Sequence, residues 1–264
     1  MPTSTATPPP SPQPAAPEAS ASDSVVDKLP VAIGGPTLRA AAIAGDRAAE
    51  FEVAMRFAQG HGVSPDQQQA AHWLELAAQQ GLAPAQFRLG GFYEKGIGVK
   101  KDLAEARTLY MAAAAKGNAK AMHNLAVLYA EGINGPGDYH IAAQWFRKAA
   151  ERGITDSQYN LGILYERGSG EQQNYAEAYK WFALAAEQGD GEAAIKRDEI
   201  ASELDQQTLE AADLTVNNWK PEPQPDDAVN VKTPAGGWDT VERVAKAKVP
   251  LPVAKPAALE SKIK

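Results

Sequence analysis

The chain has 264 residues, of which 44% are hydrophobic and 22% are charged, and this is enough for one or two globular domains with a sizeable buried interior. A net charge of -7 and the lack of a lysine or arginine run argue against nucleic acid as a partner. Without cysteine, disulfides, thiolate nucleophiles and cysteine-ligated zinc are excluded. Because no apolar run reaches about 18 residues, we expect no membrane span within this chain.

The two ends of the chain differ in composition from its middle. Residues 1–36 contain nine prolines and few large apolar side chains, so they bury too little surface to offset the entropy of ordering, and they are predicted to form a disordered arm. From residue 220 onward, proline, lysine and small residues alternate without helical or strand periodicity, which predicts a flexible tail over 220–264. The folded part is therefore predicted to span 37–219.

A repeat of 36 residues organises this folded part. The segment AMHNLAVLYAEG at 121–132 returns as SQYNLGILYERG at 157–168, and the self-alignment runs without a gap from 45 to 189. Each repeat opens on a glycine, from which positions are counted as zero. The predicted repeats are numbered 1 to 4 and span 45–80, 81–116, 117–152 and 153–188.

The first half of each repeat predicts an α-helix, here named helix A. Large apolar residues at positions 8 and 12 fall on one stripe of a helix, with alanine or glycine at position 9 beside them. A glycine at position 15 supplies the left-handed residue that commonly ends a helix. The position-12 residues are Phe57, Tyr93, Tyr129 and Tyr165, and the position-15 residues are Gly60, Gly96, Gly132 and Gly168.

The second half predicts another helix, named helix B. Position 21 carries an N-cap residue in every repeat, and in three repeats position 24 completes a capping-box pattern. Large apolar residues at position 29 precede an alanine pair at positions 32 and 33, so large side chains face small ones. The N-cap residues are Asp66, Asp102, Asp138 and Asn174, and the position-29 residues are Leu74, Tyr110, Phe146 and Phe182.

A single repeat cannot be stable alone. About six large apolar side chains, each contributing about 1.5–3 kcal/mol on burial, face an ordering cost of about 1–2 kcal/mol for each backbone residue. Neighbouring repeats must cover the apolar faces, which predicts an all-α fold: a right-handed α-solenoid of four helix-turn-helix repeats. Residues 37–44 resemble the end of a helix B and are predicted to cap repeat 1. Capping helices are predicted over 189–219, the last of them opened by Asp205.

The repeat pattern resembles a known family. Its elements are G-D/N-x-x-A, then N-L-A/G-x-L-Y-x-x-G, then D-x-x-x-A-x-x-W-F-x-x-A-A. This pattern is similar to the Sel1-like repeat, a tetratricopeptide relative with a longer loop between its helices. The similarity covers about 45–200 and implies a helical solenoid that binds other proteins.

A second, narrower resemblance concerns particular segments. PTLRAAAIAGD, AMHNLAVLYAEG, DSQYNLGILYERG, YKWFALAAEQGD, AAIKRDEIASELD and WKPEPQPDDAVNV are similar to the C-terminal region of the PodJ family of alphaproteobacterial polar localization factors. This resemblance implies a role in cell polarity and a periplasmic location, with a membrane anchor upstream of this segment. A native start at Met1 would instead favour the cytoplasm.

Candidate catalytic and metal-binding residues do not form a recognisable site. The histidines show no HExxH motif and no spacing with carboxylates that would gather several ligands on one helix face. Aspartates and glutamates could pair for glycan cleavage, but most fall at helix caps or on exposed helix faces. We therefore expect a protein that is not an enzyme and that needs neither metal nor cofactor. The histidines are His61, His72, His123 and His140.

A binding surface is expected on helix A. Positions 3, 6, 10 and 13 lie on the face opposite the apolar stripe, which lines the concave groove in tetratricopeptide-like stacks. Aromatic and aliphatic side chains there would suit an extended peptide, with asparagines at position 7 bonding its backbone. Alternatively, these side chains merely pack between successive A helices. The candidate partner-binding residues are Phe51, Met55, Phe87, His123, Asn124, Val127, Tyr159, Asn160 and Ile163.

The sequence therefore favours a noncatalytic scaffold that binds a partner protein or peptide in its concave groove, as part of a polar localization factor. One alternative is a module that binds peptidoglycan or regulates a cell-wall enzyme, with an envelope component as its partner. The other is a Sel1-type adaptor, cytoplasmic or secreted, that is unrelated to polarity.

Overall fold

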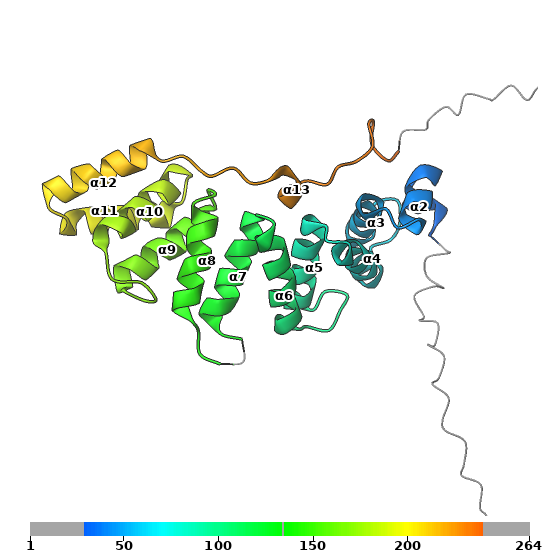
Figure 1. Ribbon diagram of the computed structural model, residues 1–264, viewed down its shortest axis with the longest axis horizontal. Coiled ribbons are helices and arrows are strands. Elements are labelled where there is room, and N and C mark those ends of the chain that lie inside the picture. The colour runs from blue at the N-terminus through cyan, green and yellow to red at the C-terminus, as the bar shows by residue number, and fades with distance from the viewer. Residues whose placement is uncertain (1–28, 134, 240–264) are drawn as a thin grey trace, which may run out of the picture.

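The computed structural model describes residues 29–133 and 135–239, and in these residues every regular element is a helix. Figure 1 shows the helices side by side in one row that follows the chain, from α2 at one end to α11 and α12 at the other. None of the helices in the described ranges is long and apolar enough to cross a membrane. This is the predicted all-helical solenoid.

Each repeat contributes one helix A and one helix B, in register with the sequence repeat. The A helices are α3 (Arg47–Gln59), α5 (Ala83–Lys95), α7 (Ala119–Glu131) and α9 (Thr155–Arg167). The B helices are α4 (Gln67–Gln79), α6 (Leu103–Ala115), α8 (Tyr139–Ala150) and α10 (Tyr175–Glu187). Each helix packs on the next one along the chain, both within a repeat and between repeats.

The predicted N-caps of the B helices are confirmed. The side chain of Asp102, for example, accepts from the N–H groups of Ala104 and Glu105 at 2.9 and 3.0 Å, which satisfies donors that a helix start leaves free. Only one half of the predicted capping box is present, namely the bonds that the N-cap side chain accepts; the N–H of the N-cap residue is not bonded to the side chain at position 24. The N–H of Asp102 donates to the carbonyl oxygen of Tyr93, at position 12 of helix A, at 2.9 Å, so each cap is tied to the preceding helix instead.

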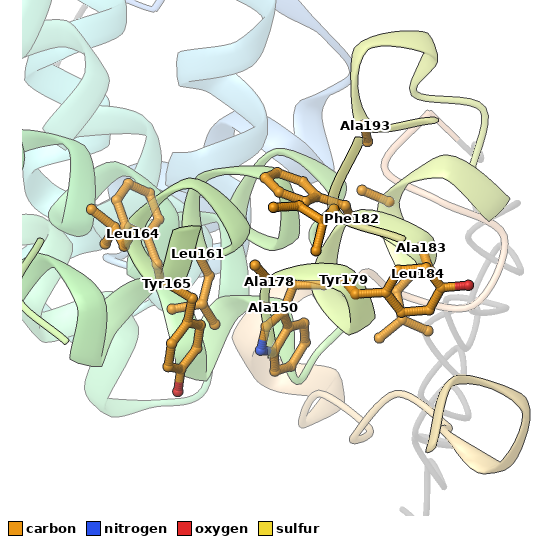
Figure 2. Packing of buried hydrophobic residues seen from close by; sticks show 14 of the residues in the cluster. Ala150, Leu161, Leu164, Tyr165, Ala178, Tyr179, Phe182, Ala183, Leu184 and Ala193 are labelled. Atoms are coloured by element: carbon orange, nitrogen blue, oxygen red, sulfur yellow. The ribbon is translucent and has the colours of Figure 1, made fainter. Parts of the chain in front are cut away.

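Large side chains of helix B lie directly on small residues of helix A. A Cβ added to Gly90 would lie 2.7 Å from the ring of Tyr110, and one added to Gly162 would lie 2.7 Å from the ring of Phe182. Both rings are completely buried. Figure 2 shows Phe182 of α10 in one apolar cluster with Leu161 and other residues of α9. The small residue at position 9 therefore sets how closely the two helices approach.

The loop between helix A and helix B also joins successive repeats. Gly98 has a φ of +67°, and a Cβ there would lie 2.0 Å from the carbonyl oxygen of Gln67, at the start of α4 in the preceding repeat. Gly170 makes the same approach to the carbonyl oxygen of Tyr139. Only glycine combines this conformation with so close a contact. The repeats are thus held together at their loops as well as through their apolar faces.

Helices close both ends of the row. At the N-terminal end, α2 (Pro36–Ile43) packs on α3, and the short 3-10 helix η1 (Val31–Ile33) precedes it. At the C-terminal end, α11 (Gly191–Glu203) and α12 (Gln206–Asn218) pack on α10, and Asp205 caps α12 as predicted. The folded part begins earlier than residue 37, because Ile33 is fully buried in the first core cluster.

Residues 220–239, here called the strap, correct the predicted flexible tail. Figure 1 shows this segment, in orange, leaving α12 and running back along one edge of the row toward α2. It contains one helical turn, α13 (Asp226–Val229), which packs against α5. Near its end, Trp238 is only 7% exposed and joins the core cluster of Ile33 and Leu38. The rest of the predicted tail, and the predicted arm up to residue 28, lie outside the described residues.

One buried carboxyl group lies in repeat 1. Glu50 of α3 is 3% exposed and its Oε2 accepts a hydrogen bond from Nε2 of Gln80 at 2.7 Å. In repeat 4, glutamine occupies the same position: Oε1 of Gln158 accepts from Nε2 of Gln188 at 2.6 Å. Burial of Glu50 raises its pKa from 4.5 to about 7, although the bond from Gln80 acts in the opposite direction.

Glu50→Gln is therefore expected to stabilise the protein at alkaline pH. Because the raised pKa belongs to the folded state, the wild-type protein loses stability as the pH rises from about 4.5 to about 7 and then levels off. The variant keeps the acceptor and removes the charge. At pH 8 its free energy of unfolding should exceed that of wild type by up to about 3 kcal/mol, seen as a higher melting temperature, with little difference near pH 4.5.

Thermal melts of both proteins across this pH range measure the effect. Glu187→Gln, which removes an exposed carboxylate from α10, is the matched control and should leave the melting temperature nearly unchanged. A gain from Glu50→Gln that is equally large at both ends of the range would contradict a titrating buried carboxyl.

Candidate partner-binding face

The predicted binding residues occupy one face of the A helices, here called the A face: positions 3, 6, 7, 10 and 13 of helix A. Every one of these predicted residues is half-buried, so none is fully buried in the core and none is fully exposed to solvent. They are Phe51 and Met55 on α3, Phe87 on α5, His123, Asn124 and Val127 on α7, and Tyr159, Asn160 and Ile163 on α9.

The aromatic side chains at position 6 each have a packing partner. The rings of Phe87 and Tyr110 are 6.0 Å apart between centroids, and those of Tyr159 and Phe182 are 5.7 Å apart. In both pairs the partner is position 29 of helix B in the same repeat. One side of the Phe87 ring and one side of the Tyr159 ring are therefore covered by packing, as the alternative interpretation expects. The covering residue, however, belongs to helix B of the same repeat and not to the next A helix. The other side of each ring remains accessible.

His123 is held by a neighbouring repeat. Its Nδ1 lies 2.8 Å from Oγ of Ser157, which is fully buried in α9. Its ring lies 5.7 Å from that of Phe146, at position 29 of its own repeat. Burial lowers the pKa of His123, although the charges of Asp156 and Glu94 act against this shift. His123 therefore joins repeat 3 to repeat 4, and the prediction that it contacts a partner receives no support from this geometry.

The two asparagines at position 7 differ. Nδ2 of Asn124 donates to Oη of Tyr110 at 2.9 Å, and Tyr110 in turn donates to Oε2 of Glu94 at 2.5 Å. Burial and the bond to Glu94 raise the pKa of Tyr110, which keeps the phenol protonated and able to donate to Glu94. Within the described ranges, the amide of Asn160 has no such partner. The predicted backbone contacts therefore fit Asn160 better than Asn124.

One further residue at position 6 lies in the C-terminal cap and is not among the predicted binding residues. Ile195 of α11 follows Gly189 by six positions, as Tyr159 follows Gly153, and its side chain is 62% exposed. The cap has no helix B ring at position 29 to cover it. Counting the repeat positions through the capping helix would have identified this residue.

The strap lies along the edge where the B helices turn into the A helices. The N–H of Glu222 donates to the carbonyl oxygen of Glu151 at 2.8 Å, and its carboxylate pairs with Arg152 at 2.9 Å. Farther along, the carbonyl oxygen of Ala228 accepts from Nδ2 of Asn118 at 2.7 Å. Oε1 of Gln224 accepts from the N–H of Ala119, in the first turn of α7, at 3.0 Å. These contacts engage the two ends of repeat 3.

The end of the strap is fixed to repeat 1. Arg56 of α3 is 7% exposed and donates to both carboxylate oxygens of Asp239, at 3.0 and 2.7 Å. The bond from Arg56 lowers the pKa of Asp239 and raises that of the guanidinium itself, which keeps both groups charged. Nothing in the helical periodicity marks this segment. The only signals are a tryptophan and two valines in a stretch that is otherwise polar and rich in proline.

Two cavities open on the A face. One of about 440 Å³ lies between the strap and helices α3 and α5, and is named the strap pocket. Its floor is Ala48, Phe51, Pro84 and Phe87, and its opposite wall includes Val229 and Val231. The other, of about 350 Å³, lies between α5 and α7 and is lined by Phe87, Tyr110 and Asn124 among others. Three of the predicted residues thus line cavities, and Phe87 lines both.

No metal site is found in residues 29–133 and 135–239, since no three histidine or acidic side chains converge there. The buried titratable groups described above, Glu50, Tyr110 and His123, lie on different helices, and each is bonded to a structural neighbour. The described residues thus present a surface with a few cavities, and these three titratable groups do not come together in any of them.

Comparison with known proteins agrees with the fold. The Sel1 repeat profile matches residues 47–82, 83–118, 119–154 and 155–190. A solved Sel1 repeat protein from Oxalobacter formigenes is 31% identical, with a TM-score of 0.57, over 68% of this chain and 76% of that chain. A search among curated proteins gave no match.

Two further solved structures resemble the chain more weakly. A protective antigen present in uropathogenic Escherichia coli strains, which displays an SLR fold, is 22% identical, with a TM-score of 0.36, over 86% of this chain and 60% of that chain. A Sel1 repeat protein described from Klebsiella pneumoniae is 22% identical, with a TM-score of 0.31, over 64% of this chain and 99% of that chain. With four consecutive matches in register with its helix pairs, the chain belongs to the Sel1 repeat family.

Proposed function

We propose that this protein is a noncatalytic scaffold that binds an extended segment of a partner protein along its A face. The observation that carries the proposal is the strap. A proline-containing segment of the chain itself lies along the row and is bound through its backbone, a side-chain amide and its carboxylates. The edge of the solenoid therefore offers the contacts that an extended polypeptide needs.

Repeat 4 and the C-terminal cap leave part of the A face open for such a partner. Tyr159, Ile163 and Ile195 form an apolar series there, and the nearest hydrogen bond and ion pair of the strap go to Glu151 and Arg152, at the end of repeat 3. A polar rim is present as well, because Lys196 pairs with Glu166 at 3.1 Å and with Glu199 at 2.9 Å. An apolar centre with a polar rim is the usual anatomy of a protein interface.

Ile195→Glu is expected to weaken partner binding at least tenfold without unfolding the protein, because Ile195 is 62% exposed and contributes little to the core. The matched control is Leu214→Glu in α12, which is also 62% exposed but does not lie at position 6 of a repeat. Proteins captured from an envelope extract by wild type and both variants would be quantified by mass spectrometry, alongside thermal melts.

The proposal requires that a set of proteins captured by wild type be retained by the Leu214→Glu variant and lost by the Ile195→Glu variant. Equal loss in both variants would mean nonspecific apolar adsorption, and equal retention would mean that this part of the A face is not the binding surface.

We further propose that the scaffold belongs to a polar localization factor and lies in the periplasm. The support is the resemblance of six segments, among them the start of the strap, to the PodJ family. Antibodies against this chain would be applied to cells of its source in which only the outer membrane has been opened. The proposal predicts staining at a cell pole. Staining that is uniform, or that appears only after the inner membrane is opened, would contradict it.

A further inference from the structure

The strap pocket is built by two parts of the chain that are far apart in sequence. Helices α3 and α5 and the start of α7 provide one side, and strap residues between 224 and 233 provide the other. With a volume of about 440 Å³, it is large enough for a side chain and the backbone on either side of it. The strap does not fill this cavity. It forms a wall of it.

The floor of the pocket is apolar. Phe51 and Phe87 occupy position 6 in repeats 1 and 2, and both are half-buried, with Pro84 beside them. Val229 on the strap side is 41% exposed, so an apolar surface faces the floor across the cavity. An apolar side chain inserted here would be covered on both sides, which is the environment in which burial stabilises binding most.

Two cations lie at the mouth of the pocket. Arg88 and Lys120 line it, both are exposed, and in the described part of the chain neither has an ion-pair partner. The acidic residue of the pocket, Glu52, is already paired with Arg56 at 2.7 Å. Because the chain as a whole has a net charge of -7, these two unpaired cations form a local positive region beside an apolar cavity. They would attract a carboxylate over about 10 Å or less.

We propose that the strap pocket binds an extended peptide segment in which an apolar residue is flanked by carboxylates. The apolar side chain enters between Phe51, Phe87 and Val229, and the carboxylates pair with Arg88 and Lys120. The inference rests on the proposed function, since it identifies the chemistry of a partner on the A face. It adds that the strap completes the site, so releasing the strap weakens binding.

The direct test is a titration of the isotope-labelled full chain followed by amide chemical shifts. The probe is the blocked synthetic peptide Gly-Ser-Asp-Leu-Asp-Ser-Gly, compared with the same peptide carrying Lys-Leu-Lys or Asp-Gly-Asp at its centre. We expect saturable shifts at Phe87, Arg88, Lys120 and Val229 with Asp-Leu-Asp, and at least tenfold weaker binding of the other two peptides. Equal binding of all three, shifts confined to other helices, or no saturable binding would overturn the proposal.

Variants separate the parts of the site. Arg88→Glu and Lys120→Glu should each weaken the Asp-Leu-Asp peptide at least tenfold, while Lys100→Glu, an equal charge change on an exposed loop of repeat 2, should not. Asp239→Lys breaks the pairing with Arg56 at the end of the strap and should also weaken binding.

Tighter binding by the Asp239→Lys variant would mean that the strap competes with the peptide, and would overturn the composite site. The proposed function is tested separately by the variants at Ile195 and Leu214, which lie at the other end of the row. If the strap pocket does not bind the peptides, the Ile195 and Leu214 variants still test the proposed function.

Discussion

The structure depends on close contact between helices that cannot cover their own apolar faces. Within a repeat, the position-29 ring of helix B rests on a position-9 glycine in repeats 2 and 4, as Tyr110 does on Gly90. Between repeats, the glycine loop at Gly98 touches the backbone at the start of the preceding helix B. These two approaches set the spacing of the helices in repeats 2 and 4 and of each of these repeats against the one before it. They explain why one pattern of small and large residues recurs every 36 residues.

Stacking leaves an edge of unsatisfied backbone groups, and the strap uses that edge. The first N–H groups of a helix have no partner inside the helix, and at the start of α7 the side chain of Gln224 accepts from one of them. Asn118, the N-cap of the same helix, bonds its own first turn at Ala121 and donates to the strap at Ala228. The solenoid thus binds an extended segment of its own chain at the start of α7 and the end of α8, and this supports the proposal that the adjoining A face binds an extended segment of another chain.

Much of the fold could be predicted from the sequence because its determinants are local. The spacing of apolar residues, the N-caps such as Asp102 and the glycines that end the A helices each act within one turn or one repeat, and they match the structure. The exception is Gly132, which ends α7 with a positive φ of 81° but a ψ of 118°, outside the predicted left-handed conformation. The strap could not be predicted, because its anchors join distant residues: Arg56 and Asp239 are 183 positions apart. For the same reason, periodicity placed His123 and Asn124 on the A face but did not show that they are hydrogen-bonded to Ser157 and Tyr110.

The dependence of each repeat on its neighbours is tested most directly by hydrogen exchange in the Gly98→Ala variant. Its added methyl group would meet the carbonyl oxygen of Gln67, whereas in the control variant Gly45→Ala the φ is also positive, at +82°, but nothing lies within 4 Å. The account predicts that Gly98→Ala speeds amide exchange in α4 of repeat 1 as well as in α5 and α6 of repeat 2. The control should change exchange only near residue 45. Faster exchange confined to the loop around residue 98, with α4 fully protected, would show that the repeats hold their structure independently.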